Sequence, residues 1–442
     1  MDIENNTYIQ TILAKFEVDS LTPMQEEAYN TIQSKSDVVL LSPTGTGKTL
    51  AYLLPIVEKL DPENTEIQML ILVPSRELAI QIEQVIRKMG SGLKINAVYG
   101  GRSGTLDKME LKHRPAILIG TPGRVADRFR RDNYTLDHIK TLVLDEFDKS
   151  LEVGFEKEMI EIIDALNNIQ KRVLTSATTQ PKIPPFVGLH KPIFIDYLKD
   201  ETSQLTIKTI VSTEKDKLET LTKTLAHIGN QPGIIFCSFK DALQRVSNHL
   251  KENQIPHGCF HGDMEQLDRE RALIKFRNGT HQLLVATDLA ARGLDIPEIK
   301  FILHYHMPLH SREFTHRNGR TARMNRDGVA YVLNWQDDDL PDYLAEIEPE
   351  NVSVNDLNAS YDIKKKQWET LYITGGRKDK ISKGDIAGLF LKQGQLTKEQ
   401  VGIIEIYQNS AYVAVHANVA QQAIKKTNNS KLKKKKVRIS IL

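Results

Sequence analysis

The chain has 442 residues, of which 40% are hydrophobic and 26% are charged, and its net charge is +2, which predicts a globular protein of two or three domains. Its two cysteines, Cys237 and Cys259, are too few for a zinc site or a disulfide framework. The amino-terminal residues lack a basic, apolar leader and no run approaches the roughly 18 apolar residues of a membrane span, so we expect a cytoplasmic protein outside the membrane.

Short apolar runs alternate with helical patterns along most of the chain. Continuous apolar strands separated by helices predict a parallel sheet that helices cover on both faces. The rhythm restarts after residue 205 and stops at 336–350, an acidic stretch with two prolines that is typical of a linker. We therefore predict two α/β domains at 1–198 and 199–345, a linker at 346–366 and a small domain at 367–442.

The first apolar run leads into the loop SPTGTGKT, residues 42–49, and then into a helical pattern. A strand, a glycine-containing loop and a helix form the setting that a phosphate-binding loop requires, although an ordinary glycine-rich turn is the alternative. Gly45 and Gly47 let backbone N–H groups approach the phosphates, Lys48 is expected to reach the β and γ oxygens, and the Thr49 hydroxyl is expected to bind Mg²⁺. The other loop residues expected around the nucleotide are Ser42, Pro43, Thr44 and Thr46.

Two adjacent carboxylates, Asp145 and Glu146, follow the apolar run that starts at Thr141. Ligands bind at the carboxyl ends of parallel strands, which is where this pair is expected to lie. Asp145 is expected to hold Mg²⁺, partly through water, and Glu146 to polarise the attacking water as general base. An Asp-Glu pair elsewhere is usually only solvated, so its position after an apolar strand favours the catalytic interpretation.

Eight motifs occur in the order that they have in the DEAD-box RNA helicases. They are LTPMQ, which contains Gln25, and then SPTGTGKT, PSRELA, TPGR, DEFD, SAT, ATDLAARGLDIP and HRNGRTAR. Over roughly residues 16–335 the chain resembles that family. The resemblance implies two RecA-like parallel-sheet domains that bind ATP and RNA, with ATP hydrolysis driving RNA unwinding. In that family Ser42 is an ordinary first residue of the phosphate loop.

The resemblance also assigns residues around the adenine and the acidic motif. Gln25 is expected to read the adenine edge and to confer preference for ATP over GTP, while a polar residue at a helix start is the alternative. Phe147 replaces the alanine of the family's acidic motif, so we expect the chemistry to survive with altered packing behind the site. Only 24 residues precede Gln25, too few to supply the family's upstream aromatic residue, and Tyr8 is the candidate substitute for stacking on adenine.

A second domain can supply arginine fingers, because phosphoryl transfer is catalysed mostly by positioning and charge stabilisation. Arg320 and Arg323 in HRNGRTAR are the candidates, although loop arginines are more often surface residues. The resemblance implies further ATP-binding and coupling residues, which are Asp148, Ser176, Thr178, Asp288, Asp295 and His316.

RNA contacts are expected along the cleft between the two α/β domains, on the side opposite the ATP site. The resemblance implies contacts to phosphates and sugars, which position a strand without reading its sequence. The core should therefore bind RNA of any sequence. The residues concerned are Arg76, Gly100, Gly101, Thr121, Gly123 and Arg124 in the first domain and Gln266, Arg269, Thr287 and Arg292 in the second.

Residues 367–442 contain 14 Lys and Arg against 5 Asp and Glu, a net charge of +9 that leaves −7 for the rest of the chain. A basic segment behind an acidic body favours a polyanion-binding appendage, although a solubilising lysine-rich end is the alternative. Its order of strands and helices predicts a small α+β, RRM-like fold. Tyr372 and Tyr412 hold aromatic places of the two RNA-stacking signatures, but Ala414 leaves the platform incomplete, and both tyrosines could be ordinary strand residues.

The same segment resembles the C-terminal domain of DbpA-type DEAD-box proteins in GRKDKISKGDI, VGIIEI, SAYVAV and KVRISIL. GRKDK places Arg377, Lys378 and Lys380 in a loop between a strand and a helix, which suits a phosphate clamp. The resemblance implies binding to structured large-subunit (23S) ribosomal RNA and a role in ribosome assembly on pre-ribosomal particles. We also expect a monomer. The alternatives are a general RNA remodeller of messenger RNA turnover or cold adaptation, and an ATP-gated RNA clamp with little unwinding.

Overall fold

The structure is a computed structural model of the chain. It describes residues 6–43, 45–101, 113–132, 134–178, 182–198, 205–288, 299–321, 328–345, 347–358 and 366–442. The chain divides near residue 203 into two compact units, each of which is treated by itself below. Within the described ranges, no helix is both long and apolar enough to cross a membrane.

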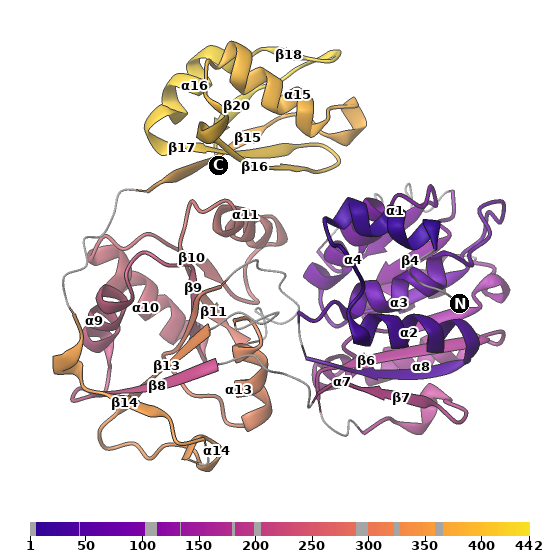
Figure 1. Cartoon of the computed structure of the whole chain (residues 1–442), viewed down its shortest axis with the longest axis horizontal. Coiled ribbons are helices and arrows are strands. Elements are labelled where there is room, and N and C mark those ends of the chain that lie inside the picture. The colour runs from indigo at the N-terminus through magenta and orange to yellow at the C-terminus, as the bar shows by residue number, and fades with distance from the viewer. Residues whose placement is uncertain are drawn as a thin grey trace. The chain divides into compact units, whose positions relative to one another are not determined.

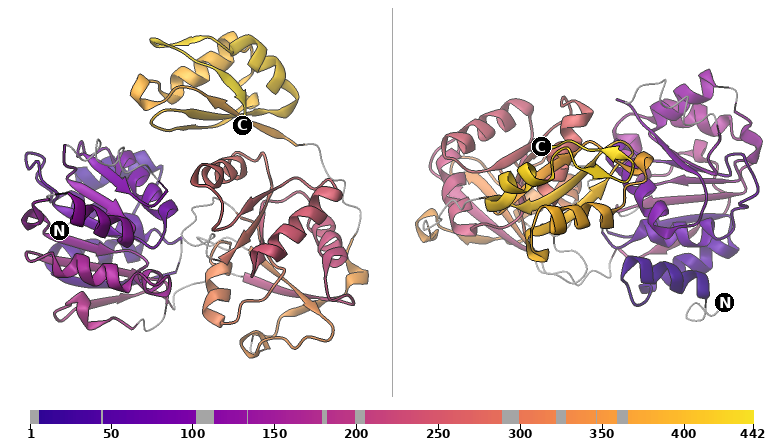
Figure 2. Two further views of the ribbon diagram at one scale, coloured as in Figure 1. Left: turned by 180° about the vertical axis from the view of Figure 1, so that it is seen from behind. Right: turned by 90° about the horizontal axis from the view of Figure 1, so that it is seen from above.

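The first unit is built around a seven-stranded parallel sheet with the strand order β3-β4-β2-β5-β6-β1-β7. Successive residues of a strand point to opposite faces: Val38 and Leu40 of β1 join the core on one face, and Val39 and Leu41 join the core on the other. Helices accordingly lie on both faces of this sheet in Figure 1 and in both views of Figure 2. The strands are β1 (Asp37–Leu41), β2 (Met69–Leu72), β3 (Ile95–Val98), β4 (Ile117–Gly120), β5 (Thr141–Leu144), β6 (Lys171–Ser176) and β7 (Ile193–Asp196).

The helices of the first unit connect these strands and start at sequence-encoded caps. Asn6, Thr22 and Ser75 each accept a backbone N–H bond with the side chain and so begin α1, α2 and α4. The helices are α1 (Thr7–Phe16), α2 (Pro23–Ser34), α3 (Lys48–Val57), α4 (Arg76–Met89), α6 (Pro122–Arg131), α7 (Phe147–Glu152) and α8 (Glu156–Asp164).

The second unit contains another seven-stranded parallel sheet, with the order β10-β11-β9-β12-β13-β8-β14. Strand β14 (Glu350–Val352) pairs with β8, so the stretch expected as a linker contributes to this sheet. The other strands are β8 (Leu205–Ser212), β9 (Gly233–Cys237), β10 (His257–Phe260), β11 (Leu283–Thr287), β12 (Phe301–His304) and β13 (Gly328–Trp335). The helices are α9 (Leu218–Ile228), α10 (Lys240–Glu252), α11 (Gln266–Arg277), α13 (Ser311–Asn318) and α14 (Asp342–Ala345).

The C-terminal domain also belongs to the second unit and has a four-stranded antiparallel sheet of order β16-β17-β15-β20, here called the C-terminal sheet. Helices α15 and α16 cover one of its faces (Figure 1) and enclose a separate apolar core. The predicted fold class, two parallel-sheet domains followed by a small α+β domain, is confirmed. The elements are β15 (Trp368–Ile373), α15 (Lys383–Gly388), β16 (Val401–Ile406), β17 (Ala411–His416), α16 (Ala420–Thr427), β18 (Lys431–Leu432), β19 (Lys435–Lys436) and β20 (Ile439–Ile441).

Candidate nucleotide and RNA sites

The predicted phosphate-binding loop connects β1 to α3. Gly45 and Gly47 have φ angles of 90° and 87°, in the left-handed region that glycine adopts without strain. A Cβ atom on Gly47 would lie 2.3 Å from Nε2 of Gln25, so this approach also requires a glycine. Thr44 lies outside the described residues. The sequence thus fixes both the turn and its contact with α2.

Lys48 begins α3 and is turned into the loop. Its ammonium group donates to the carbonyl oxygen of Pro43 at 2.6 Å and also to that of Ser42. The Thr46 hydroxyl donates to the Pro43 carbonyl at 2.9 Å and lies 2.7 Å from the Ser42 hydroxyl. Lys48 is only 8% exposed, and its charge is therefore compensated by loop oxygens. Phosphate oxygens could replace these carbonyls as acceptors, because they offer the same contact with a full negative charge.

Gln25 caps a helix, which is the alternative role that the sequence left open, and it also contacts the phosphate loop. Its backbone N–H donates to the Thr22 hydroxyl at 3.3 Å, and its own side-chain oxygen accepts from the Thr22 N–H at 3.0 Å, which makes a capping box for α2. Its Nε2 donates to the carbonyl oxygen of Gly47 at 3.3 Å. The side chain therefore ties the start of α2 to the phosphate loop. Tyr8, the candidate for adenine stacking, packs against the core on α1, where burial raises the pKa of its hydroxyl.

Asp145 is the buried carboxylate at the end of β5 and is 3% exposed. One oxygen accepts from the Tyr52 hydroxyl at 3.0 Å and the other accepts from the Thr175 hydroxyl. Burial raises the pKa of Asp145, while the Thr175 bond and the Lys48 charge act in the opposite direction. A carboxylate in this position has its orientation fixed and would be stabilised by a cation.

Glu146 and Asp148 follow on the turn into α7. Glu146 has φ 49° and ψ 48°, a left-handed conformation that non-glycine residues adopt at a cost and that is common at functional sites. Its backbone N–H donates to the Thr175 hydroxyl at 3.0 Å. The Asp148 carboxylate accepts from the Thr178 hydroxyl at 2.6 Å. The structure therefore links the acidic motif to the SAT motif on the next strand, with the Ser176 hydroxyl accepting the Thr178 N–H at 3.0 Å.

Thr175 is a residue of this site that the sequence reasoning missed. Its hydroxyl contacts both Asp145 and the Glu146 backbone, and its side chain is fully buried. The signal was present, because Thr175 is a polar residue inside an apolar strand, directly before the SAT motif. Phe147, the departure from the family pattern, is also fully buried and packs in the core behind the acidic motif.

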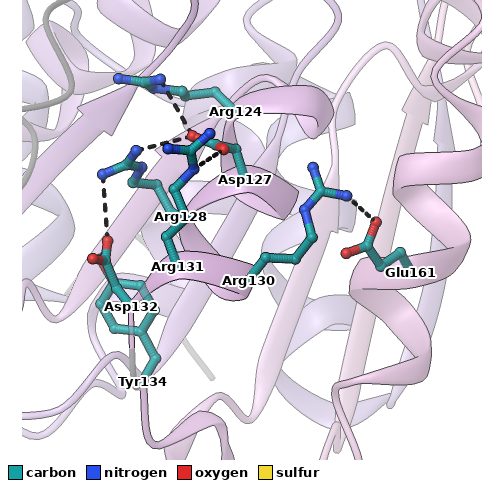
Figure 3. A network of polar contacts seen from close by, with 8 residues as sticks. All are labelled: Arg124, Asp127, Arg128, Arg130, Arg131, Asp132, Tyr134 and Glu161. Carbon is teal, nitrogen blue, oxygen red and sulfur yellow. Dashed lines mark hydrogen bonds and ion pairs between the residues drawn. The ribbon is translucent and has the colours of Figure 1, made fainter.

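The predicted RNA-facing residues of the first unit cluster around α6 and α4. Thr121 precedes α6, and Arg124 in its first turn lies 3.4 Å from Asp127. Asp127 also accepts from Arg128 at 2.9 Å and from Arg131 at 2.5 Å (Figure 3), and the Arg128 hydrogen bond is the main reason that the pKa of Asp127 is lowered. Other contacts in Figure 3 are Arg128 with Asp132, the Tyr134 hydroxyl with Asp132, and Arg130 with Glu161 at 2.8 Å.

Arg76 at the start of α4 lies beside the two predicted glycines. A Cβ atom on Gly100 would be 3.1 Å from a guanidinium nitrogen of Arg76. Gly101 has φ 86°, again in the left-handed region. The structure thus brings Arg76 and the Gly100–Gly101 turn together, while Gly123 lies in the first turn of α6.

In the second unit, Arg317 contacts Asp288, and the sequence reasoning had not singled it out. Its guanidinium donates to both Asp288 oxygens, at 2.5 and 2.6 Å, and to the His306 carbonyl at 2.6 Å. It also lies 5.0 Å from the centre of the Phe236 ring and is 3% exposed. Arg317 lies inside the HRNGRTAR motif, directly after His316, and this place in the motif was the signal that the sequence offered.

The remaining predicted residues of the second unit occupy three places. Arg320 is 7% exposed just after α13, on which His316 lies. Gln266 begins α11 and contacts Glu270 at 3.1 Å, and the Arg269 guanidinium lies 4.9 Å from the centre of the Phe260 ring. Thr287 ends β11. Arg292, Asp295 and Arg323 lie outside the described residues.

In the C-terminal domain, Tyr372 and Tyr412 are direct cross-strand partners with ring centres 5.6 Å apart. Tyr372 is half-buried, but Tyr412 is only 4% exposed. The loop between β15 and α15 holds Arg377, Lys378 and Lys380, and all three are exposed. The predicted loop position of these cations is therefore correct, whereas the predicted stacking surface is largely covered.

Comparison with known proteins identifies the same parts. Three family models match: DEAD/DEAH box helicase over residues 22–184, helicase conserved C-terminal domain over 216–325, and DbpA RNA binding domain over 370–441. The ATP-dependent RNA helicase DbpA of Escherichia coli (strain K12) is 31% identical over 96% of this chain and 94% of that protein. The DbpA helicase of Bacillus subtilis (strain 168) is 30% identical over 95% and 94%, respectively.

Solved structures agree with these matches. S. cerevisiae Dbp5 bound to RNA and ADP BeF3 has a TM-score of 0.72 at 25% identity, over 80% of this chain and 95% of that one. Mss116p bound to ssRNA and AMP-PNP has a TM-score of 0.68 at 27% identity, over 79% and 77%. Fold, loop geometry and matches together define an ATP-dependent RNA helicase of the DEAD-box class with an added RNA-binding domain. Within that class the chain belongs to the DbpA family.

Proposed function

We propose that this helicase uses ATP and Mg²⁺ to remodel structured large-subunit ribosomal RNA during ribosome assembly, acting in the cytoplasm as a monomer on pre-ribosomal particles. The observation that carries the target is the exposed group of cations in the loop between β15 and α15, on a domain separate from the helicase core. Phosphate and sugar contacts by the core carry little sequence information. A preference must therefore come from the added domain, whose clustered cations can match the arrangement of phosphates on a folded RNA.

The residues present fit Mg²⁺. Thr49 offers a hydroxyl and Asp145 a carboxylate, which are the hard oxygen ligands that Mg²⁺ prefers, and the buried Asp145 would gain most from a cation. The ion would neutralise phosphate charge. Lys48 binds phosphate oxygens in place of the Pro43 carbonyl, and Glu146, held in a fixed backbone conformation, accepts a proton from the attacking water.

The remaining assigned residues act on binding and coupling. Gln25 orients the adenine edge next to the loop that it already contacts. The Asp148–Thr178 hydrogen bond connects the acidic motif to the RNA side, and Arg320 stabilises charge that develops on the γ-phosphate. The residues of the two RecA-like domains that are expected to contact RNA hold its backbone. Arg377, Lys378 and Lys380 of the C-terminal domain hold the preferred RNA.

The test compares ATPase stimulation by large-subunit ribosomal RNA and by an unrelated structured RNA at one salt concentration. We expect the intact chain to prefer the ribosomal RNA, and the variant R377A/K378A/K380A to lose most of that preference while its ATPase still responds to saturating unrelated RNA. Equal stimulation of the intact chain by both RNAs would instead identify a general RNA remodeller. ATP binding without RNA-stimulated turnover would identify a clamp.

A further inference from the structure

The residue that ends strand β12, His304, is fully buried and uses both of its ring nitrogens. Its Nε2 lies 2.9 Å from the side-chain oxygen of Asn318, and its Nδ1 lies 3.3 Å from a guanidinium nitrogen of Arg317. A guanidinium can only donate, so Nδ1 accepts from Arg317 and Nε2 carries the proton that is donated to Asn318. Burial and the neighbouring charge of Arg317 lower the pKa of His304 to about 3, which keeps the ring in this neutral form.

The same arginine connects His304 to the carboxylate of the ATDLAARGLDIP motif. Its Nε and Nη2 donate to the two oxygens of Asp288 at 2.5 and 2.6 Å, and its Nη1 donates to the His306 carbonyl at 2.6 Å as well as to His304. The contacts form one series, Asp288–Arg317–His304–Asn318, here called the polar chain. Its last three members are at most 6% exposed. Loss of one link would leave a buried donor or acceptor unpaired, so the chain fixes the places of its members.

The polar chain ends at the turn that carries Arg320. Helix α13 ends at Asn318, the Arg320 N–H donates to the Arg317 carbonyl at 3.1 Å, and the Thr321 N–H donates to the Asn318 carbonyl at 2.9 Å. The Thr321 hydroxyl donates to the carbonyl oxygen of Ile299, just before β12, at 2.8 Å. Arg320 therefore lies between two residues whose side chains are bonded to the β12 segment. The position of its backbone depends on the contacts that its neighbours make.

Aromatic rings fix the plane of the His304 ring. Its centre lies 6.3 Å from that of Phe236 in β9 and 4.7 Å from that of Phe314 in α13, and the Phe314 ring lies 5.7 Å from Tyr343 in α14. The Tyr343 hydroxyl donates at 2.6 Å to the carbonyl of Pro308, in the loop that leads into α13. A phenylalanine could fill the same place among these rings. Packing alone therefore does not require a histidine, and the ring nitrogens are needed for the polar chain.

We propose that His304 is a positioning residue for ATP hydrolysis, because it fixes the turn that carries Arg320. Through Arg317 and Asn318 it holds this turn against β12 and links it to Asp288. The effect on catalysis rests on the proposed function, in which Arg320 is the arginine finger, whereas the contacts of His304 do not. Transition-state stabilisation depends on donors that are already in place, and a displacement of about 1 Å can cost about 10²-fold in rate. His304 should therefore act on kcat rather than on substrate affinity.

H304F tests the ring nitrogens, because it keeps an aromatic ring and removes both polar atoms. We expect RNA-stimulated kcat to fall by about 10- to 100-fold, while KM for ATP and the RNA concentration for half-maximal stimulation stay within about threefold of the parent values. H304Q can still donate to Asn318 and should keep kcat within about fivefold of the parent chain. A kcat of H304F within threefold of the parent, or equal losses in H304F and H304Q, would overturn the proposal.

H257F is the matched control for a loss of stability. His257 also uses both ring nitrogens, which contact the Ser247 hydroxyl and the Ile255 carbonyl at 2.8 Å each. It begins β10, whereas His304 ends β12, so the two lie at opposite edges of the same parallel sheet. H257F should lower the melting temperature but keep kcat within about threefold at a temperature where both variants are folded. A kcat loss equal to that of H304F would assign the effect to stability and overturn the proposal.

A double-mutant cycle shows whether His304 acts through Arg320. If it does, H304F/R320A should turn over no more slowly than R320A, because the group that His304 positions is already absent. Independent effects would multiply, and the double variant would then be about 10- to 100-fold slower than R320A in single-turnover assays. Such a multiplied loss would contradict the proposal.

Hydrogen exchange measures the turn without reference to activity. H304F should raise exchange about tenfold or more in peptides that cover residues 313–321, whereas H257F should leave these peptides unchanged. Unchanged exchange in H304F would show that His304 does not hold the turn, and the arginine-finger assignment would stand without it. Near-normal kcat in R320A would instead overturn the finger assignment, and with it the route by which His304 acts on hydrolysis.

Discussion

The two units differ in how far their functional residues can be read from motifs. In the first unit, Lys48, Asp145 and Asp148 lie where the motif order places them, and each is held by a neighbouring strand or loop. In the second unit, the motif assignments did not include Arg317, which pairs with the assigned Asp288, or the pair Arg277–Glu405. The difference arises because phosphate chemistry demands fixed residue types, whereas the fit between packed elements can be met by many pairs.

The first unit also keeps a functional conformation at some cost to stability. Asp145 is buried with a raised pKa, and Glu146 is in a left-handed conformation. Neither feature helps an empty protein to fold. Both are consistent with a site arranged for a bound cation and water, and the fixed geometry explains why these motifs are informative.

Glu146→Gln should have the largest effect. It tests whether the residues identified from motifs in the first unit carry out the chemistry. We expect RNA-stimulated kcat to fall by about 10³-fold or more because the proton acceptor is lost, while ATP affinity and the melting temperature stay close to those of the parent chain. Steady-state ATPase assays and nucleotide titration measure the two quantities. Near-normal turnover would remove Glu146 from the general-base role.

Arg320→Ala and Arg317→Ala separate a catalytic from a structural arginine within one motif. Arg320→Ala should lower kcat by about 10³-fold with little change in ATP affinity or stability, since a finger acts on developing charge. Arg317→Ala should instead destabilise the second unit by about 2 to 3 kcal/mol, because Asp288 loses a largely buried partner. Thermal unfolding and ATPase assays distinguish them. A reversed pattern would exchange the two roles.

The sequence predicted the elements and the motif residues but not the contacts between distant strands. Alternating apolar runs were enough for both parallel sheets, because the pattern of a buried parallel strand is local. Thr175 escaped notice because its contact with Asp145 exists only once β6 lies next to β5. The burial of Tyr412 escaped for the same reason, since a strand pattern does not say which neighbour covers its outer face. Strand β14 was taken for a linker because three residues are too few to show a period.

A lower pH should weaken the second unit through its buried histidines. Burial lowers the pKa of His304 to about 3 and the pKa values of His281 and His306 to about 4. These rings stay neutral when folded but are protonated below pH 6.5 when unfolded, so stability is lost as the pH falls from about 6.5 towards 4. His304, which is fully buried, should contribute about 1.4 kcal/mol per pH unit.

Thermal unfolding between pH 7 and 5 measures this effect. His304→Gln is the matched variant, because its amide can still donate towards Asn318, which lies 2.9 Å from the His304 ring. The variant should be less stable at pH 7 but should show a shallower decline with falling pH. An identical slope in both proteins would mean that His304 is not the source.

Tyr372→Leu should have the smallest effect. It tests whether an aromatic residue of the second unit contacts RNA or only packs against its neighbours. A base stacked on this ring would contribute about 1 to 3 kcal/mol, so its loss would weaken RNA binding by roughly 5- to 150-fold. If the ring instead only packs beside Tyr412, leucine keeps an apolar contact there and RNA affinity at fixed salt should stay within twofold. Titration of the same structured RNA into the parent chain, this variant and R377A/K378A/K380A places the result on one scale. If Tyr372→Leu weakens RNA binding as much as the loss of the three cations does, the sheet takes part in RNA recognition. Leucine can replace the apolar packing of the tyrosine ring, but it cannot stack on a base, so a large loss of RNA affinity would indicate stacking.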